Sequence, residues 1–311
     1  MTPVTTPTPA FGKGIALKLG SVAAFTVMFA MMKAVADRVP PGEMVFFRSA
    51  FGIVPIVISL ALSHELSGGI RVQSPLAHIL RGLIGTCSMG LGFAALAFLP
   101  LPEATVIGYA APILTVIFAA LLLGEQVRLV RSAAVVLGMI GVVIVLWPQL
   151  EGQASRSEAI GAGLALCGAC CTALVMIHIR RMVGTERTSA IVFWFSFTAA
   201  TLSLLTLPFG WVLPTPGEAA LLIGAGLIGG CAQILMTSAY RFADASVIAP
   251  FEYTSIVVAL ILGYTVFGEV PARTTLIGAA VVIAAGVLII WREHQLGLER
   301  RRPRKATTPH G

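Results

Sequence analysis

The stretch DASVI at Asp244–Ile248, followed by FGE at Phe267–Glu269, repeats in looser form a stretch of the first half: EATVI at Glu103–Ile107, followed by LGE at Leu123–Glu125. Each copy lies in a hydrophobic half that reads as five membrane spans. Because five is odd, the second copy would cross the bilayer in the opposite sense to the first. Inverted repeats of this kind are typical of carriers that open alternately to the two sides of a membrane.

The composition predicts a membrane protein. Hydrophobic residues make up 57% and charged residues 11% of the 311 residues, and the mean hydropathy is +0.92. A soluble domain has about a quarter of its residues charged. The first dozen residues lack both a basic start and a small-residue cleavage site, so we expect no cleaved signal peptide.

A window of about 20 residues predicts an all-α integral membrane protein with ten transmembrane helices. The expected spans lie near 15–36, 43–63, 76–98, 103–122, 131–148, 160–180, 189–210, 218–240, 245–267 and 274–291. The expected organisation is a first five-helix repeat at 12–148, a linker at 149–159, a second repeat at 160–292 and a basic cytoplasmic tail at 293–311. The two repeats would be inverted and would surround a central cavity.

Nearly constant sequence shifts support the duplication. VFFRS at Val45–Ser49 matches VFWFS at Val192–Ser196 at a shift of 147 residues. Gly124-Glu125 matches Gly268-Glu269 at a shift of 144 residues. The halves are therefore related, although they are not interchangeable.

Lysine and arginine residues are distributed unevenly over the two sides of the membrane. If the amino terminus is cytoplasmic, sixteen of them, including Lys18, are assigned to the inner side and five to the outer side. Positive residues favour the cytoplasmic side, so both termini are expected there and the net charge of +7 reflects topology. The basic run Arg300–Lys305 favours contact with anionic lipid headgroups, and we expect no nucleic-acid partner.

The paired motifs resemble those of the EamA family of the drug/metabolite transporter superfamily. In each half, an ATVI or ASVI stretch begins the fourth span and a Gly-Glu pair ends it. The resemblance covers about residues 12–292. It implies ten helices, a central cavity between two bundles, and transport of small organic solutes; the best-known members export amino acids and other metabolites through the inner membrane. APFEYTS at Ala249–Ser255 also resembles a branch with uptake carriers for riboflavin and S-adenosylmethionine.

Polar and aromatic residues inside the spans predict a substrate site. Proline frees backbone carbonyls inside the fourth and ninth spans, and broken helices often border transporter sites. A tyrosine hydroxyl at that depth needs a partner or a wet cavity. The preferred neighbourhood is Tyr109, Pro112, Pro250, Glu252 and Tyr253, and the further candidates are Trp194, Gln233 and Arg48.

Arg48 and Glu252 are charged residues inside spans. A charge there costs about 2.5–3.5 kcal/mol unless it snorkels or finds a partner. The counterpart of Arg48 in the second half is Phe195, so repeat symmetry does not explain the charge. Two interpretations stay open. The two side chains face a common polar cavity or pair across the bundles, or Arg48 reaches the outer headgroups while Glu252 caps a helix.

Charged residues also mark the span ends. Lys33 near the outer end of the first span matches Arg180 at the inner end of the sixth. Matched cations at opposite faces fit two mirror-related gates, but snorkelling alone gives the same pattern, and we favour snorkelling. Glu125 and Glu269 end their spans beside Arg128 and Arg273. A local ion pair or a bend at the membrane surface is therefore expected at each, rather than proton carriage.

Signatures of an enzyme are missing from the sequence. It contains no GxxxxGK[ST] loop, no HExxH motif and no Ser/His/Asp grouping at a membrane face. The five cysteines fall within spans without a histidine at ligand spacing, so we expect neither a metal nor a cofactor. Transport energy would come from an ion gradient or from the gradient of the substrate.

Three functions remain: an exporter, an uptake carrier of the same fold, and a membrane-embedded enzyme or scaffold. The third would need catalytic polar residues or a sizeable loop, which the sequence does not show. We favour a monomeric carrier that exports amino acids or related metabolites across the bacterial inner membrane by alternating access. The alternative is uptake of riboflavin or S-adenosylmethionine.

Overall fold

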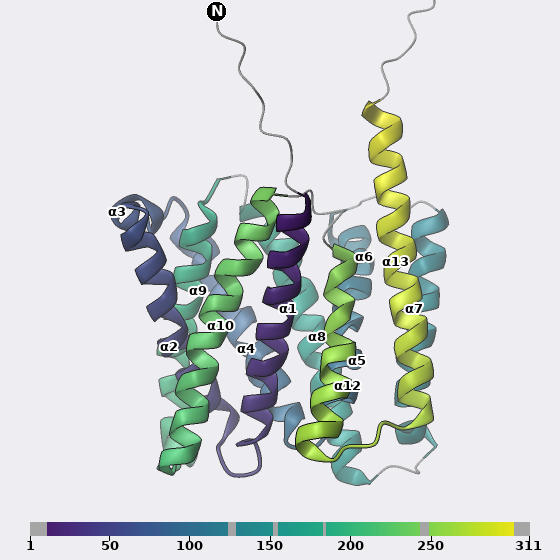
Figure 1. Ribbon diagram of the computed structural model, residues 1–311, viewed down its shortest axis with the longest axis horizontal. Coiled ribbons are helices and arrows are strands. Elements are labelled where there is room, and N and C mark those ends of the chain that lie inside the picture. The colour runs from purple at the N-terminus through teal and green to yellow at the C-terminus, as the bar shows by residue number, and fades with distance from the viewer. Residues whose placement is uncertain (1–10, 124–128, 152–154, 183–184, 243–248, 302–311) are drawn as a thin grey trace, which may run out of the picture.

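The computed structural model describes residues 11–123, 129–151, 155–182, 185–242 and 249–301, and every regular element among them is a helix (Figure 1). Its elements are α1 (Phe11–Lys33), α2 (Pro41–Leu62), α3 (Leu66–Gly69), α4 (Pro75–Leu96), α5 (Leu101–Gly108), α6 (Ala110–Leu123), α7 (Leu129–Leu150), α8 (Arg156–Met182), α9 (Thr188–Ser203), η1 (Leu204–Phe209), α10 (Pro216–Phe242), η2 (Ala249–Tyr253), α12 (Thr254–Phe267) and α13 (Arg273–Arg301). Here η marks a 3₁₀ helix.

Among the described residues, seven segments are long and apolar enough to cross a bilayer: Gly12–Lys33, Pro41–Leu62, Pro75–Leu96, Leu101–Leu122, Arg156–Ile179, Thr188–Phe209 and Pro216–Ala239. The remaining three expected spans coincide with shorter apolar helices, Val135–Pro148, Phe251–Phe267 and Arg273–Leu288. The chain is therefore a multi-pass, all-helical membrane protein. The full layout of ten spans in two repeats stays a prediction.

Proline and glycine set several helix ends. Pro41, Pro75 and Pro216 occupy the first turns of their helices, where a missing N–H costs no hydrogen bond. Gly210 and Gly268 follow helices with φ of 98° and 66°, a left-handed conformation that glycine adopts without steric cost. One end differs from expectation, because α13 continues to Arg301 and the expected tail begins as helix.

Both expected helix breaks are present. The fourth span divides into α5 and α6, and the Tyr109 amide between them donates to the carbonyls of Thr105 and Val106. Pro112, in the first turn of α6, cannot donate to the Gly108 carbonyl. In the second half, the short helix η2, which contains Pro250, precedes α12. Each break places a tyrosine at a helix junction.

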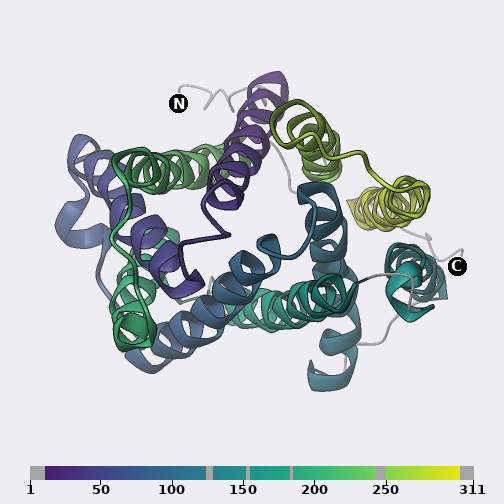
Figure 2. The ribbon, with the colours of Figure 1, turned by 90° about the horizontal axis from the view of Figure 1, so that it is seen from below.

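The helices lie side by side (Figure 1), and in cross-section the bundle is elongated (Figure 2). The helices α2, α3 and α9 lie at one end, and α7 and α13 lie together at the other. The main contacts pair α1 with α10, α4 with α8, α7 with α13, and α2 with both α9 and α10. We call the face where α1 ends and α2 begins the α1–α2 face.

Small residues allow two of these pairs to approach closely. A Cβ on Gly278 of α13 would lie 2.7 Å from the carbonyl oxygen of Gly141 on α7. A Cβ on Gly230 of α10 would lie 2.5 Å from the carbonyl oxygen of Gly52 on α2. Because helix packing in a membrane depends on van der Waals contact, close backbone approach stabilises these pairs.

Candidate functional site

The break between α5 and α6 places Tyr109 against η2. Its hydroxyl donates to the Glu252 carbonyl oxygen at 2.5 Å and lies 2.6 Å from the hydroxyl of Ser255. The ring centroids of Tyr109 and Tyr253 are 4.9 Å apart, with the ring planes 33° from parallel. The two interrupted spans therefore meet through their tyrosines.

Lys18 on α1 reaches the same place. Its Nζ lies 3.3 Å from Oε1 of Glu252, and the Lys18 side chain is 1% exposed while that of Glu252 is 49% exposed. A buried cation is thus neutralised by a carboxylate that remains accessible. We call Lys18, Tyr109, Glu252, Tyr253 and Ser255 the tyrosine group. Its charges and rings can orient a polar solute that enters beside Glu252.

Lys18 was missed by the sequence analysis, which counted it among the cytoplasmic cations. The available signal was its position inside the first expected span, where a lysine needs a partner. Its pairing with Glu252 also corrects the expectation that Glu252 caps a helix or pairs with Arg48.

A second polar group surrounds Phe195 on α9. Arg48 is 8% exposed, and its Cζ lies 5.7 Å from the centroid of the Phe195 ring. Arg81 on α4 places its Cζ 4.0 Å from the same centroid. The interpretation that Arg48 reaches lipid headgroups is therefore wrong, because the side chain is buried between helices. We call Arg48, Arg81 and Phe195 the arginine group.

A small hollow lies beside Arg48. It has a volume of about 10 Å³, which is room for about one water molecule. Its walls come from α2, α9 and α10 and consist of Arg48, Gly52, Ile56, Val192, Phe195, Ser196, Gly229, Gly230 and Gln233. Two of the predicted site residues, Arg48 and Gln233, thus line one hollow.

At the α1–α2 face, Lys33 at the end of α1 contacts the segment that follows α12. Its Nζ lies 2.9 Å from Oε1 of Glu269 and donates to the Leu99 carbonyl at 2.6 Å. The second carboxylate oxygen of Glu269 accepts the Leu101 amide at 2.9 Å. The two charged side chains are only 13% and 15% exposed. This ion pair joins α1, the start of α5 and the end of α12.

The pair corrects two expectations. Lys33 does not snorkel, and Glu269 does not pair with Arg273 beside it. The left-handed turn at Gly268 folds the chain back so that the Glu269 amide donates to the Gly263 carbonyl at 2.9 Å. That reversal directs the Glu269 carboxylate toward α1. The other Gly-Glu pair, at 124–125, lies outside the described residues.

The remaining predicted site residues lie apart from these groups. The Trp194 indole donates to the Ile70 carbonyl at 2.9 Å, just after α3 at the opposite face. Pro112 is exposed, one turn beyond Tyr109. The side chain of Pro250 lies outside the described residues, although its backbone belongs to η2.

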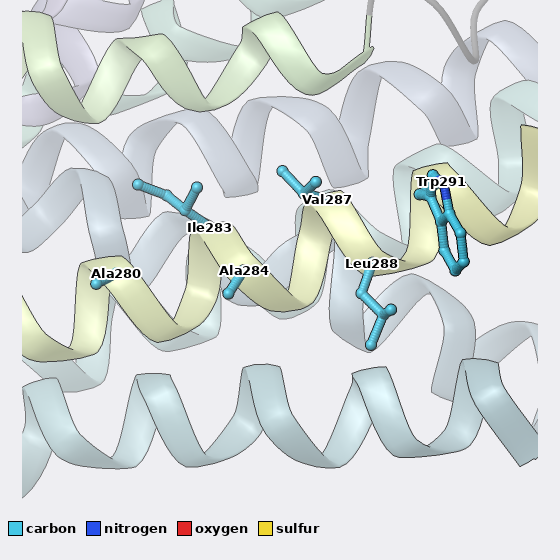
Figure 3. Close-up of a pocket in the computed structure, with 6 residues that line it drawn as sticks. All are labelled: Ala280, Ile283, Ala284, Val287, Leu288 and Trp291. Atoms are coloured by element: carbon cyan, nitrogen blue, oxygen red, sulfur yellow. The ribbon is translucent and has the colours of Figure 1, made fainter.

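A larger hollow of about 640 Å³ lies along α13 (Figure 3). It is lined by apolar side chains alone: Ala280, Ile283, Ala284, Val287, Leu288 and Trp291. A solute site requires a few placed polar groups to orient its ligand. The tyrosine and arginine groups supply such groups, so we place the candidate site there and not on α13.

Comparison with known proteins decides the family. The model of the EamA-like transporter family matches residues 12–147 and again residues 159–291. The chain belongs to the EamA-like transporter family. As an EamA-like protein it is a membrane transporter and not an enzyme. The resemblance found in the sequence is thereby confirmed.

Several EamA-like transporters named for their function are similar over much of the chain. The S-adenosylmethionine uptake transporter of Rickettsia bellii is 30% identical, over 90% of this chain and 94% of that protein. The pseudopaline exporter CntI of Pseudomonas aeruginosa is 27% identical, over 89% and 95%. The riboflavin transporter of Rhizobium johnstonii is 29% identical, over 72% and 73%. These relatives include an exporter and an uptake carrier.

A solved crystal structure shares the fold. It has a TM-score of 0.64 and 20% sequence identity, and the alignment covers 92% of this chain and 99% of the other. At that identity the likeness concerns the fold alone.

Proposed function

We propose that this EamA-like protein is a carrier of amino acids or related metabolites that works by alternating access across a bacterial inner membrane. The observation that carries the proposal is the buried ion pair between Lys33 and Glu269, which closes the α1–α2 face. Toward the start of α1, where Lys18 pairs with Glu252 of η2, the Glu252 side chain remains 49% exposed. A site that is closed at one face and reachable elsewhere is what one half of an alternating-access cycle requires.

The helix contacts support two inverted repeats. The shift of 147 residues relates α1 to α8, α2 to α9, α4 to α10 and α7 to α13, and α6 corresponds to α12. Replacing each helix by its counterpart turns the contact of α1 with α10 into that of α8 with α4, which is also present. In the same way, the contact of α10 with α2 becomes the observed contact of α4 with α9. The contacts α7–α13 and α2–α9 map onto themselves. Such a pattern is what a twofold axis through the bundle centre produces.

The distribution of cations supports the orientation. Lys18, Arg48 and Arg81 lie between the helices and do not count as loop cations. The remaining fourteen lysine and arginine residues on one side and four on the other favour an outer α1–α2 face and cytoplasmic termini. In the described conformation, the ion pair therefore closes the outer end.

The relatives bear on substrate and direction. Export, as by the pseudopaline exporter, fits the function predicted from the sequence. The second candidate is uptake of S-adenosylmethionine or riboflavin, and the 30% identity to the Rickettsia uptake transporter favours it. S-adenosylmethionine is itself an amino-acid derivative, so both candidates share a substrate class.

The test is counterflow into proteoliposomes loaded with unlabelled amino acids, S-adenosylmethionine or riboflavin. A carrier drives transient accumulation of labelled solute against its own gradient for at least one compound. Glu252→Gln and Tyr253→Ala should lower the rate while the protein remains folded. Absence of accumulation for every compound would contradict the proposal, and unchanged rates in both variants would remove the tyrosine group from the site.

A further inference from the structure

We propose that the arginine group is an anion subsite that binds a carboxylate of the transported solute. The inference rests on the proposed function and adds a substrate class to it. The geometry that points to it is a pair of guanidinium groups on one aromatic ring, buried between α2, α4 and α9.

The two guanidinium groups have donors to spare. Nε of Arg48, and Nε and Nη1 of Arg81, are buried and make no hydrogen bond within the described part of the chain. Among the described residues, no carboxylate forms an ion pair with either arginine. The acids of the other two groups have their own partners: Glu252 pairs with Lys18, and Glu269 pairs with Lys33. An unpartnered buried cation is costly, and an incoming anion would relieve that cost.

Neutral polar groups surround the same place. Ser196 and Gln233 line the hollow beside Arg48. The hydroxyl of Ser49, the next residue, does not line the hollow, but it is buried and has no hydrogen-bond partner among the described residues. Arginine presents its N–H groups in a fork that matches the two oxygens of a carboxylate. Both guanidinium groups lie over the face of the Phe195 ring, so the N–H groups at their edges remain free to donate hydrogen bonds.

The position of the group suits a transport site. Arg48 and Phe195 are equivalent residues of the two repeats, 147 positions apart, and they contact each other. Residues related by a twofold axis can touch only close to that axis, so the group lies near the axis of the proposed repeats, at the α2–α9 end of the bundle. An axis in the membrane plane places the group at the depth of the midplane, where carriers of this plan bind their substrates. The hollow has room for about one water in this conformation. Three of its lining residues are glycines, so no bulky side chain has to leave when the helices separate.

The binding test uses the purified full-length protein in nanodiscs, in chloride-free buffer, with benzoate and benzamide as probes. The two have nearly the same shape and differ in charge. Benzoate should raise the unfolding temperature of the wild type, because a ligand that binds only the folded state stabilises it. Benzamide should not. In Arg48→Gln and Arg81→Gln, the affinity for benzoate should fall about tenfold or more.

Arg273→Gln is the matched control, since it removes an exposed arginine at the end of the bundle and should leave benzoate binding unchanged. Without any anion, Arg48→Gln should unfold at the same temperature as the wild type or higher, because an unpaired buried charge has been removed. Arg48→Lys should keep part of the binding.

Four results would overturn the proposal: no stabilisation by benzoate, equal stabilisation of all variants, unfolding of Arg48→Gln at a lower temperature, or arginine-dependent stabilisation by chloride but not by benzoate. The last would make the group a site for an inorganic counter-ion. Failure of the proposed function is separate, because it would appear as absent counterflow in a protein that still binds benzoate through Arg48 and Arg81.

Discussion

Nζ of Lys33 lies 2.9 Å from Oε1 of Glu269, and this ion pair connects the end of the first membrane span to the end of the helix that precedes α13. The lysine also donates to the Leu99 carbonyl, and the glutamate accepts the Leu101 amide. One contact therefore holds together three parts of the α1–α2 face, and these parts separate in the outward-open state of the proposed cycle.

Removing one member of this pair should destabilise the closed conformation. Lys33→Met leaves the Glu269 carboxylate with little exposure and without its cation. We expect a loss of about 3 kcal/mol in unfolding free energy, the lower end of the range for buried pairs. The double variant with Glu269→Gln should recover part of that loss, and a double-mutant cycle by thermal unfolding measures the coupling.

The exposed pair Arg38–Glu218 at the same face is the matched control. The Arg38 side chain is 47% exposed, so its removal should cost less than about 1 kcal/mol. Equal losses at the two pairs would contradict the assignment of the closing contact to Lys33 and Glu269.

Tyr109→Phe should lower the transport rate. The hydroxyl bonds the Glu252 carbonyl and Ser255, and its loss removes both contacts, at about 0.5–1.5 kcal/mol for a typical hydrogen bond. Counterflow in proteoliposomes measures the effect. Tyr264→Phe is the control, because Tyr264 is 64% exposed on the helix surface. Equal rates for wild type and Tyr109→Phe would show that the junction is not part of the site.

Gly286→Val should disturb the same site from α13. A side chain there would overlap the Tyr253 ring, so the ring has to leave its present position beside Tyr109. We expect lower counterflow with retained folding, measured beside size-exclusion profiles. In Gly163→Ala, the added Cβ meets nothing within 4 Å, and a gain of up to about 1 kcal/mol in helix propensity is expected. Normal transport by Gly286→Val would argue against a role for Tyr253.

Glu186 gives a pH-dependent contribution to stability at the opposite face. Burial alone would raise the pKa of its carboxyl, but the amides of Ser74 and Gln73 donate to it, at 2.5 and 2.9 Å, and His78 lies 3.3 Å away. Together these contacts hold the pKa of Glu186 below its ordinary value. Because the folded-state pKa is lowered, this stabilisation is present above the ordinary carboxyl pKa of about 4.3 and is lost as pH falls through the folded value.

The unfolding temperature of the wild type should therefore exceed that of Glu186→Gln at pH 7, and the difference should shrink below about pH 4. Thermal unfolding from pH 3 to 8 measures it. A difference that is constant over that range would contradict the assignment.

The sequence predicted what depends on local chemistry. The breaks at Pro112 and Pro250 follow from a missing N–H, which is a property of the residue itself. The spans with long apolar runs follow from composition in the same way. The family could be recognised because its short motifs recur in the same order in both halves.

The partners of the charged residues could not be predicted. Lys33 meets Glu269, and Lys18 meets Glu252, from opposite ends of the chain, and no local pattern encodes those contacts. Arg81 lies close to the end of its expected span. An arginine at such a position can snorkel or be buried, and the sequence around it is the same in both cases. The contact between Arg81 and the Phe195 ring on α9 distinguishes the two cases.

Measuring the distance between two spin labels on the outer face by double electron–electron resonance tests alternating access most directly. Spin labels at Asp37→Cys and Val270→Cys, both exposed positions beside the closing pair, would be attached after replacement of the five native cysteines. The account predicts two distance populations in nanodiscs, with the longer one increased by Glu269→Gln. A single distance, unchanged by Glu269→Gln and by transported solute, would contradict an outer end that opens and closes.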